Sequence, residues 1–285
     1  MSQLLNIFLL SLVAGLGTGL GGLIAILQKP GRRRFGFFMG IAAGVMISLS
    51  FLELVNEAWR LQGFVTATIG FGLGAIFMFI IDMLVPHIRF GEEEIHRPAR
   101  QTQPGIEGQV HTSRHRIRRA RRRSHIVDQK LFRSGVLIAI GITIHNLPEG
   151  IAVGAGFMHQ PRFGYFVALA ILLHNIPEGI AAAMPLSKCG VRKWESFRVA
   201  LFSGLVEPIG ALIAAIFLAQ FAGLIPGALA FAGGVMVFIT LDELVPAARE
   251  YGHQHYTAMG IILGSIFVFL LSGLMGVSHW PSDMR

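Results

Sequence analysis

Two copies of one hexapeptide, H-N-x-P-E-G, carry the residues best suited to chemistry. The first copy is H-N-L-P-E-G at 145–150 and the second is H-N-I-P-E-G at 174–179. In each copy His and Glu are four residues apart, so both project from one face of a helix. The proline between them removes a backbone donor and bends the helix beside the His, which can add carbonyl ligands. Imidazole together with carboxylate suits Zn, Fe, Ni or Mn better than Ca or Mg. The repeated motif therefore predicts a transition-metal site.

The motifs lie in a chain with the composition of a helical membrane protein. Of its 285 residues, 53% are apolar and 14% are charged, and the mean hydropathy is +0.61. Soluble domains have about 45–50% apolar and about 25% charged residues, which excludes a water-soluble globule, a disordered chain and a disulfide scaffold. A bilayer crossing needs roughly 20 mostly apolar residues. Eight segments qualify: 4–27, 36–56, 64–86, 132–156, 163–186, 197–220, 225–247 and 256–277. We therefore predict an all-α polytopic membrane protein with eight transmembrane helices.

The positive charges predict how the chain is oriented. Successive connections between the predicted helices lie on alternate sides of the membrane. One side then carries all but three of the 24 Lys and Arg residues, and the other carries only Arg60, Arg162 and Arg285. The positive-inside rule then places the basic side in the cytoplasm and both termini outside. The basic run at 111–123 would suggest nucleic acid in a soluble protein. Beside the inner leaflet, we expect it to bind anionic lipid instead, and no nucleic acid.

An internal repeat divides the chain. Residues 43–55 resemble 233–245 at an offset of about 190 residues, and residues 73–80 resemble 263–270 at the same offset. Helices 1–3 thus match helices 6–8, and the predicted topology makes the repeat inverted, which is typical of secondary transporters with a midplane site. The predicted regions are 1–87 with helices 1–3, an Arg-rich cytoplasmic loop at 88–131 that we expect to be disordered, 132–186 with the central helix 4/5 pair, and 187–285 with helices 6–8.

The candidate ligands meet in one predicted pocket. Glu207, followed by Pro208, interrupts the otherwise apolar sixth segment and adds a carboxylate to the two motifs. An ionisable side chain within the bilayer costs at least about 2.5–3.5 kcal/mol on insertion scales. Because no Lys or Arg lies in the interior of these segments, a bound cation is the expected partner for the acids. The predicted ligands are His145, Asn146, Glu149, His174, Asn175, Glu178 and Glu207.

Three functions use such a pocket. The first is transport of a divalent transition metal into the cytoplasm, with the ion as cargo and no cofactor. No phosphate-binding loop is present, so direct ATP use is not expected. The second is an intramembrane zinc hydrolase, which is disfavoured because the chain has no H-E-x-x-H motif. The third is a cation channel, which slow saturable uptake would exclude. We predict a transporter and not an enzyme.

Both motifs and the segment S-G-L-V-E-P-I-G at 203–210 resemble the ZIP family of zinc and iron permeases, particularly its bacterial members. The likeness extends over nearly the whole chain. It implies uptake of zinc first, with Fe²⁺, Mn²⁺ or Cd²⁺ as further cargo, across the bacterial cytoplasmic membrane. It also implies a homodimer and an elevator, in which helices 1, 4, 5 and 6 carry metal past helices 2, 3, 7 and 8. Many relatives have a His-rich loop after helix 3, whereas this loop is Arg-rich.

The resemblance also implies individual roles. His145, Glu149, His174 and Glu178 match one metal position, where Met46 matches a soft ligand that helps close the outer side. Asn146, Asn175 and Glu207 match a second position, with Glu149 and Glu178 bridging the two. Further residues resemble exit ligands on the cytoplasmic side: His87, Asp242, Glu243 and His253, with Asp82 close to that route.

Overall fold

The computed structural model describes residues 3–28, 30–84, 129–188, 191–251 and 253–277. Across these residues the chain is helical and contains no strand. The predicted loop at 88–131 and His87 therefore fall almost entirely outside the described residues. In chain order the elements are α1 (Gln3–Gln28), α2 (Arg32–Ser48), η1 (Leu49–Val55), α3 (Asn56–Leu84), α5 (Gln129–His159), α6 (Pro161–Lys188), α7 (Lys193–Gly204), α8 (Glu207–Gln220), η2 (Ala222–Leu224), α9 (Ile225–Ile239), η3 (Thr240–Leu244), α10 (Val245–Tyr251) and α11 (Gln254–Met275).

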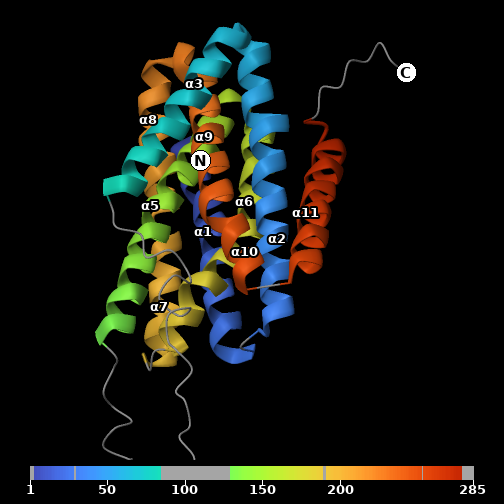
Figure 1. Ribbon diagram of the computed structural model, residues 1–285. Coiled ribbons are helices and arrows are strands. Elements are labelled where there is room, and N and C mark those ends of the chain that lie inside the picture. The colour runs from blue at the N-terminus through green and yellow to red at the C-terminus, as the bar shows by residue number, and fades with distance from the viewer. Residues whose placement is uncertain (1–2, 29, 85–128, 189–190, 252, 278–285) are drawn as a thin grey trace, which may run out of the picture.

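Six segments among the described residues are long and apolar enough to cross a bilayer: Gln3–Gln28, Arg32–Leu84, Pro161–Ser187, Lys193–Gln220, Ala222–Arg249 and Gln254–Met275. The second of these has 53 residues. As one straight helix it would extend about 80 Å, far beyond a hydrocarbon core of about 30 Å. It reverses direction at Gly63, whose φ of 83° is favourable only for glycine. Figure 1 shows this turn at the top, between the ascending α2 and the descending α3.

Five helices pack into what we call the motif bundle: α1, α5, α6, α7 and α8. Glycine allows their backbones to touch. A Cβ at Gly179 on α6 would overlap the carbonyl oxygen of Thr18 on α1, and a Cβ at Gly150 on α5 would overlap that of Glu207 on α8. Gly204 on α7 abuts α1 in the same way. The last residue of each H-N-x-P-E-G copy is thus a helix-packing residue, as small residues are in membrane interfaces.

The remaining elements form the flanking bundle: α2, η1, α3, α9, η3, α10 and α11. Within it, a Cβ at Gly44 on α2 would overlap the carbonyl oxygen of Ile261 on α11, and one at Gly74 on α3 would overlap that of Phe231 on α9. Among the described glycines, each one that approaches the backbone of another helix does so within its own bundle. The two bundles meet where α2 lies along α6 and where α9 lies along α5.

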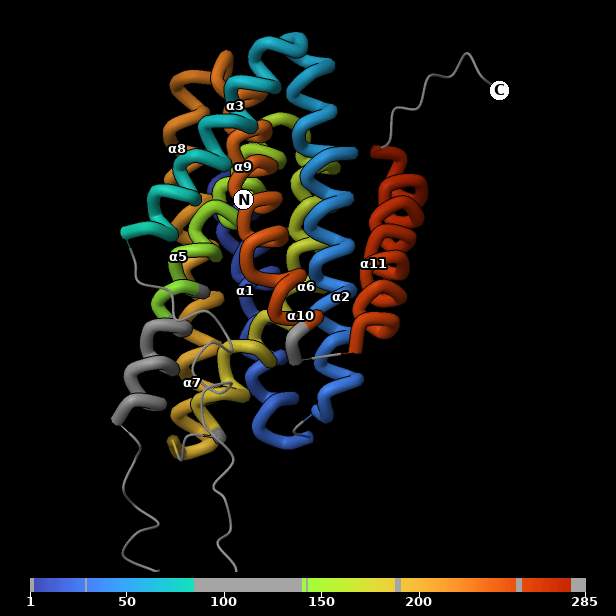
Figure 2. The backbone as a smooth tube through the Cα atoms, viewed as in Figure 1, coloured from blue at the N-terminus to red at the C-terminus, as the bar shows by residue number. Residues whose placement is uncertain are grey.

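Two π-helical segments interrupt the flanking bundle. η1 joins α2 to α3 and η3 joins α9 to α10. Figure 2 shows that the chain continues through each of these π-helical segments without reversing direction. The extra residue per turn in a π-helix often occurs at functional sites. η1 contains Glu53 and η3 contains Glu243, so the wider turns occur where the sequence repeat aligns two acids.

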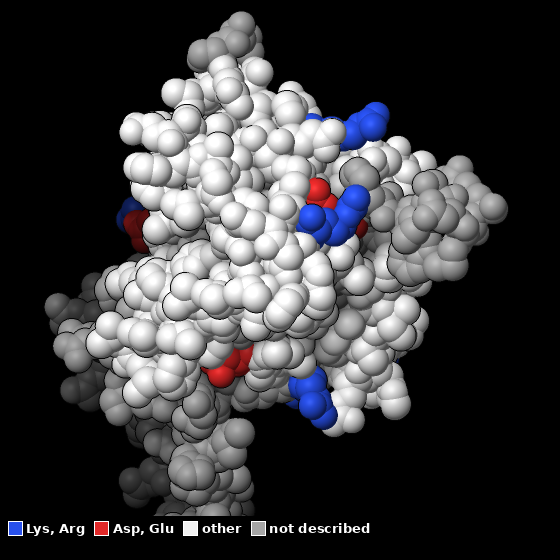
Figure 3. Space-filling view, turned by 90° about the horizontal axis from the view of Figure 1, so that it is seen from above, with Lys and Arg blue, Asp and Glu red and all other residues white. Residues whose placement is uncertain are grey.

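The two ends of the molecule differ in charge. Arg32, Arg33, Arg34, Arg192 and Lys193 lie at the start of α2 and of α7, at the bottom of Figure 1, which we call the basic end. The opposite end, which we call the far end, is viewed in Figure 3. It is largely uncharged, with small separate groups of acidic and basic side chains.

Candidate metal centre

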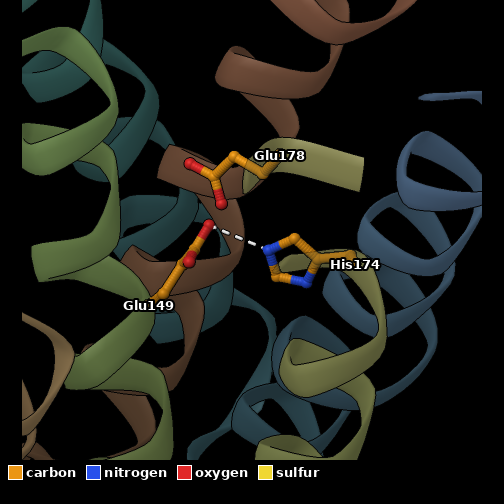
Figure 4. A group of neighbouring side chains, drawn as sticks. All are labelled: Glu149, His174 and Glu178. Carbon is orange, nitrogen blue, oxygen red and sulfur yellow. Dashed lines mark hydrogen bonds and ion pairs between the residues drawn. The ribbon is translucent and has the colours of Figure 1, made fainter. Parts of the chain in front are cut away.

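The two motif helices bring three ligands into one cluster. Glu149 on α5 and His174 and Glu178 on α6 each offer a ligand atom, and these atoms all lie within 4.8 Å of one another. Nε2 of His174 is 3.0 Å from Oε1 of Glu149. Figure 4 shows the two carboxylates and the imidazole turned toward one another from facing helices. Zinc ligands at about 2.0–2.2 Å from one ion lie at most about 4.4 Å apart, so small side-chain movements would suffice to enclose one.

The cluster is enclosed by protein and has unsatisfied acceptors. Glu149 and His174 are both buried, at 1% exposure each, and Glu178 is partly buried. Oε2 of Glu149 and Oε2 of Glu178 are shielded from solvent and accept no hydrogen bond. Buried carboxylate oxygens without donors are costly unless a proton or a cation meets them. The chemistry of this donor set therefore fits a divalent cation with affinity for nitrogen and oxygen.

A cavity lies beside the cluster and is lined by three further residues that the sequence analysis named: Met46, His145 and Glu243. Its lining residues are Met39, Met46, His145, Glu149, His174, Glu178, Ala181, Ile239, Glu243, Leu244 and Ala247. Nε2 of His145 is 3.2 Å from Oε1 of Glu243 in η3. Glu243, which by resemblance matches an exit ligand, lies against His145 at the cavity itself. No Lys or Arg is among the lining residues.

The cavity extends from the ligands toward the basic end. On α2, Met39 lies nearer that end than Met46 does, and on α6, Ala181 lies nearer it than Glu178. Beyond Glu243, the wall continues along η3 and α10 in the same direction. At the opposite side, Met46 is buried, and the hydroxyl of Thr240 donates to its Sδ at 3.6 Å. Met46 is thus the lining residue of α2 that lies nearer the far end, and Met39 is the one that lies nearer the basic end.

A second group of predicted ligands lies next to this cluster. The predicted sixth segment, 197–220, consists of two helices in the structure, because α7 ends at Gly204 and α8 begins at Glu207. Nδ2 of Asn175 donates to Oε1 of Glu207 at 2.5 Å and to the carbonyl oxygen of Ala14 at 2.9 Å. Asn146 is completely buried, and neither polar atom of its side chain has a hydrogen-bond partner.

Of the other predicted exit residues, those that the structure describes are not part of the cluster of Glu149, His174 and Glu178. Asp242 is exposed, Asp82 is partly buried near the end of α3, and His253 is exposed at the start of α11. The rings of His253 and His255 lie 5.5 Å apart by their centroids. His87 lies outside the described residues.

The chain is similar to known proteins over nearly its whole length. Residues 3–277 match the family model described as ZIP Zinc transporter. The chain is 40% identical over 288 residues to the zinc transporter ZupT of Akkermansia muciniphila, covering 94% of this chain and 97% of the relative. It is 38% identical over 285 residues to ZupT of Corynebacterium efficiens, covering 96% and 98%. It is also 38% identical over 267 residues to the zinc transporter ZTP29 of Arabidopsis thaliana, covering 92% of each chain.

The predictions of a transporter and of transmembrane helices are thereby confirmed, and the hydrolase alternative is wrong. The chain belongs to the ZIP zinc transporter family.

Proposed function

We propose that this protein moves zinc through the membrane by way of the cluster of Glu149, His174 and Glu178. One observation carries the proposal: the duplicated motifs place these ligand atoms within 4.8 Å of one another beside a cavity. His145 lines the same cavity and supplies the second imidazole. No Lys or Arg lines the cavity, so no positively charged side chain of these types repels a doubly charged cargo there. Fe²⁺, Mn²⁺ and Cd²⁺ are proposed as further cargo, because they accept the same ligand types.

We propose a second metal position beside the first. Asn175 and Glu207 are hydrogen-bonded to each other, and Oε2 of Glu207 is buried without a donor. Asn146 offers an unpartnered amide in the same bundle. Glu149 and Glu178 would bridge the two positions, since each has one free buried carboxylate oxygen.

The proposed topology has eight crossings with both termini outside. The segment Arg32–Leu84 supplies two crossings because it turns back at Gly63. α5, at 31 residues, is long enough to supply another crossing. The basic end then lies in the cytoplasm by the positive-inside rule. Because the cavity extends toward that end, this conformation is the inward-open one. The bacterial relatives favour the cytoplasmic membrane as its location.

The glycine contacts support an inverted repeat. At an offset of about 190 residues, the contact of Gly44 with Ile261 has a counterpart in that of Gly234 with Phe71. Gly74 with Phe231 likewise has a counterpart in Gly264 with Ile41. The π-helical segments η1 and η3 fall at the same offset. Such repeats give a transporter two related halves around a midplane site.

We further propose an elevator movement of the motif bundle against the flanking bundle. The motif bundle contains predicted helices 1, 4, 5 and 6, and the flanking bundle contains helices 2, 3, 7 and 8. Close backbone contacts at glycines join the helices within each bundle. Among the described glycines, no such backbone contact joins one bundle to the other. Each bundle can therefore move as a unit. A homodimer and binding of anionic lipid by the Arg-rich loop complete the proposal.

Uptake into zinc-free liposomes that contain a zinc-sensitive dye tests this function. The wild-type protein should give saturable zinc entry. Glu178→Ala and His145→Ala should each abolish it while the protein still inserts and remains monodisperse. His255→Ala is the matched control, because His255 is exposed and does not line the cavity. Wild-type rates in a Glu178→Ala/His145→Ala double variant would contradict the proposal, and uptake that fails to saturate would favour a channel.

A further inference from the structure

An ion pair joins the two bundles at a distance from the metal cluster. Oε1 of Glu57 lies 3.0 Å from Nε2 of His159. Glu57 is in the first turn of α3, in the flanking bundle, and His159 is the last residue of α5, in the motif bundle. Their side chains are only 12% and 18% exposed, so water and salt screen the pair incompletely.

His159 contacts Glu57 from the other bundle, whereas Arg60 contacts it from the same helix. Arg60 also contacts Glu57, with Nη1 3.5 Å from Oε2, but it lies one turn along the same helix. That contact stays intact however the bundles move. The ring of Phe163, which follows His159 in the motif bundle, lies edge-on to the imidazole at 5.6 Å. It helps to fix the orientation of His159 toward Glu57.

In the proposed inward-open state, the pair lies on the closed side of the transport route. Along the helical path from Met46 toward the far end, Glu57 lies about 16 Å beyond Met46 at a rise of 1.5 Å per residue. The cavity extends from Met46 in the other direction, toward the basic end. When two packed bodies alternate between two arrangements, contacts on the closed side must separate for that side to open.

We propose that Glu57 and His159 form a latch that stabilises the inward-open state and must break before the metal site is exposed to the outside. This inference rests on the proposed movement of the motif bundle. Loss of the latch raises the outward-open fraction. Because apparent affinity scales with the fraction of molecules in the binding-competent state, the half-saturating concentration of external zinc falls.

Distances between spin labels on the two bundles measure the populations without relying on transport. Labels are placed at Gln62 and Gln160, which are exposed and flank the latch, in a Cys189→Ser background. Glu57→Ala and His159→Ala should each increase the long-distance population about twofold to fivefold, the range expected for loss of a partly exposed ion pair. The Glu57→Ala/His159→Ala double variant should match either single variant, because both changes remove one interaction. Arg60→Ala is the control and should leave the populations unchanged.

A charge-reversed pair guards against indirect effects. Glu57→His combined with His159→Glu keeps an ion pair across the bundles and should restore the wild-type populations and the wild-type half-saturation. Unchanged populations in the single alanine variants, or additive effects in the double variant, would overturn the latch. The proposed transport fails in a different way: zinc would not enter liposomes with the wild-type protein, and zinc would not alter the label distances.

Discussion

Replacing Gly179 with alanine tests whether the motif glycines hold the metal centre in place. A Cβ at Gly179 would overlap the carbonyl oxygen of Thr18 and would lie 2.7 Å from its carbonyl carbon and 2.9 Å from its Cα. These are backbone atoms of α1, so no side-chain rotation relieves the clash, and α1 and α6 must move apart. Overpacking of this kind costs about 1–3 kcal/mol.

This cost predicts a measurable loss of thermal stability. At about 2–4 °C per kcal/mol for a chain of this size, Gly179→Ala should lower the melting temperature of the purified protein by about 2–12 °C. Zinc affinity should also fall, because Glu178 is the adjacent residue. Gly72→Ala is the matched control, since a Cβ at Gly72 on α3 would have no atom within 4 Å. The reasoning is refuted if both variants melt at the wild-type temperature and bind zinc equally well.

Three further predictions concern the residues around the cluster. Asn175→Ala removes the donor to Glu207, and we expect about 10–100-fold weaker zinc binding by calorimetry; unchanged affinity would exclude Asn175 from the site. Met46→Ala leaves a cavity at a buried position and should destabilise the protein by about 2–5 kcal/mol in denaturation experiments; an unchanged free energy of unfolding would contradict this prediction. Half-saturating zinc in liposome uptake should rise as the pH on the metal side falls, because carboxylates and imidazoles must lose protons to bind metal; a flat profile would contradict direct ligation.

The cluster was predictable from the sequence because helical spacing alone decides which motif residues share a face. Glu149, His174 and Glu178 converge as the two H-N-x-P-E-G copies predict. The sequence showed that Glu207 interrupts the apolar sixth segment, but the division of this segment into α7 and α8 was not predicted. The roles of these residues as metal ligands remain predictions for the experiments above.

Contacts between distant helices could not be predicted in the same way. Hydropathy sets where a helix crosses the bilayer, but packing against neighbours sets its rotation. For that reason the sequence did not indicate that Glu243 would meet His145, or that Glu57 would meet His159. The π-helical turns of η1 and η3 were missed too, because a change of hydrogen-bond register leaves no mark in composition.

Crystals grown with zinc provide the most direct measurement, through anomalous density at the zinc edge. We expect a peak enclosed by Glu149, His174 and Glu178, about 2.0–2.2 Å from their ligand atoms. Zinc bound only at other residues, with these three side chains unoccupied at saturating metal, would contradict it.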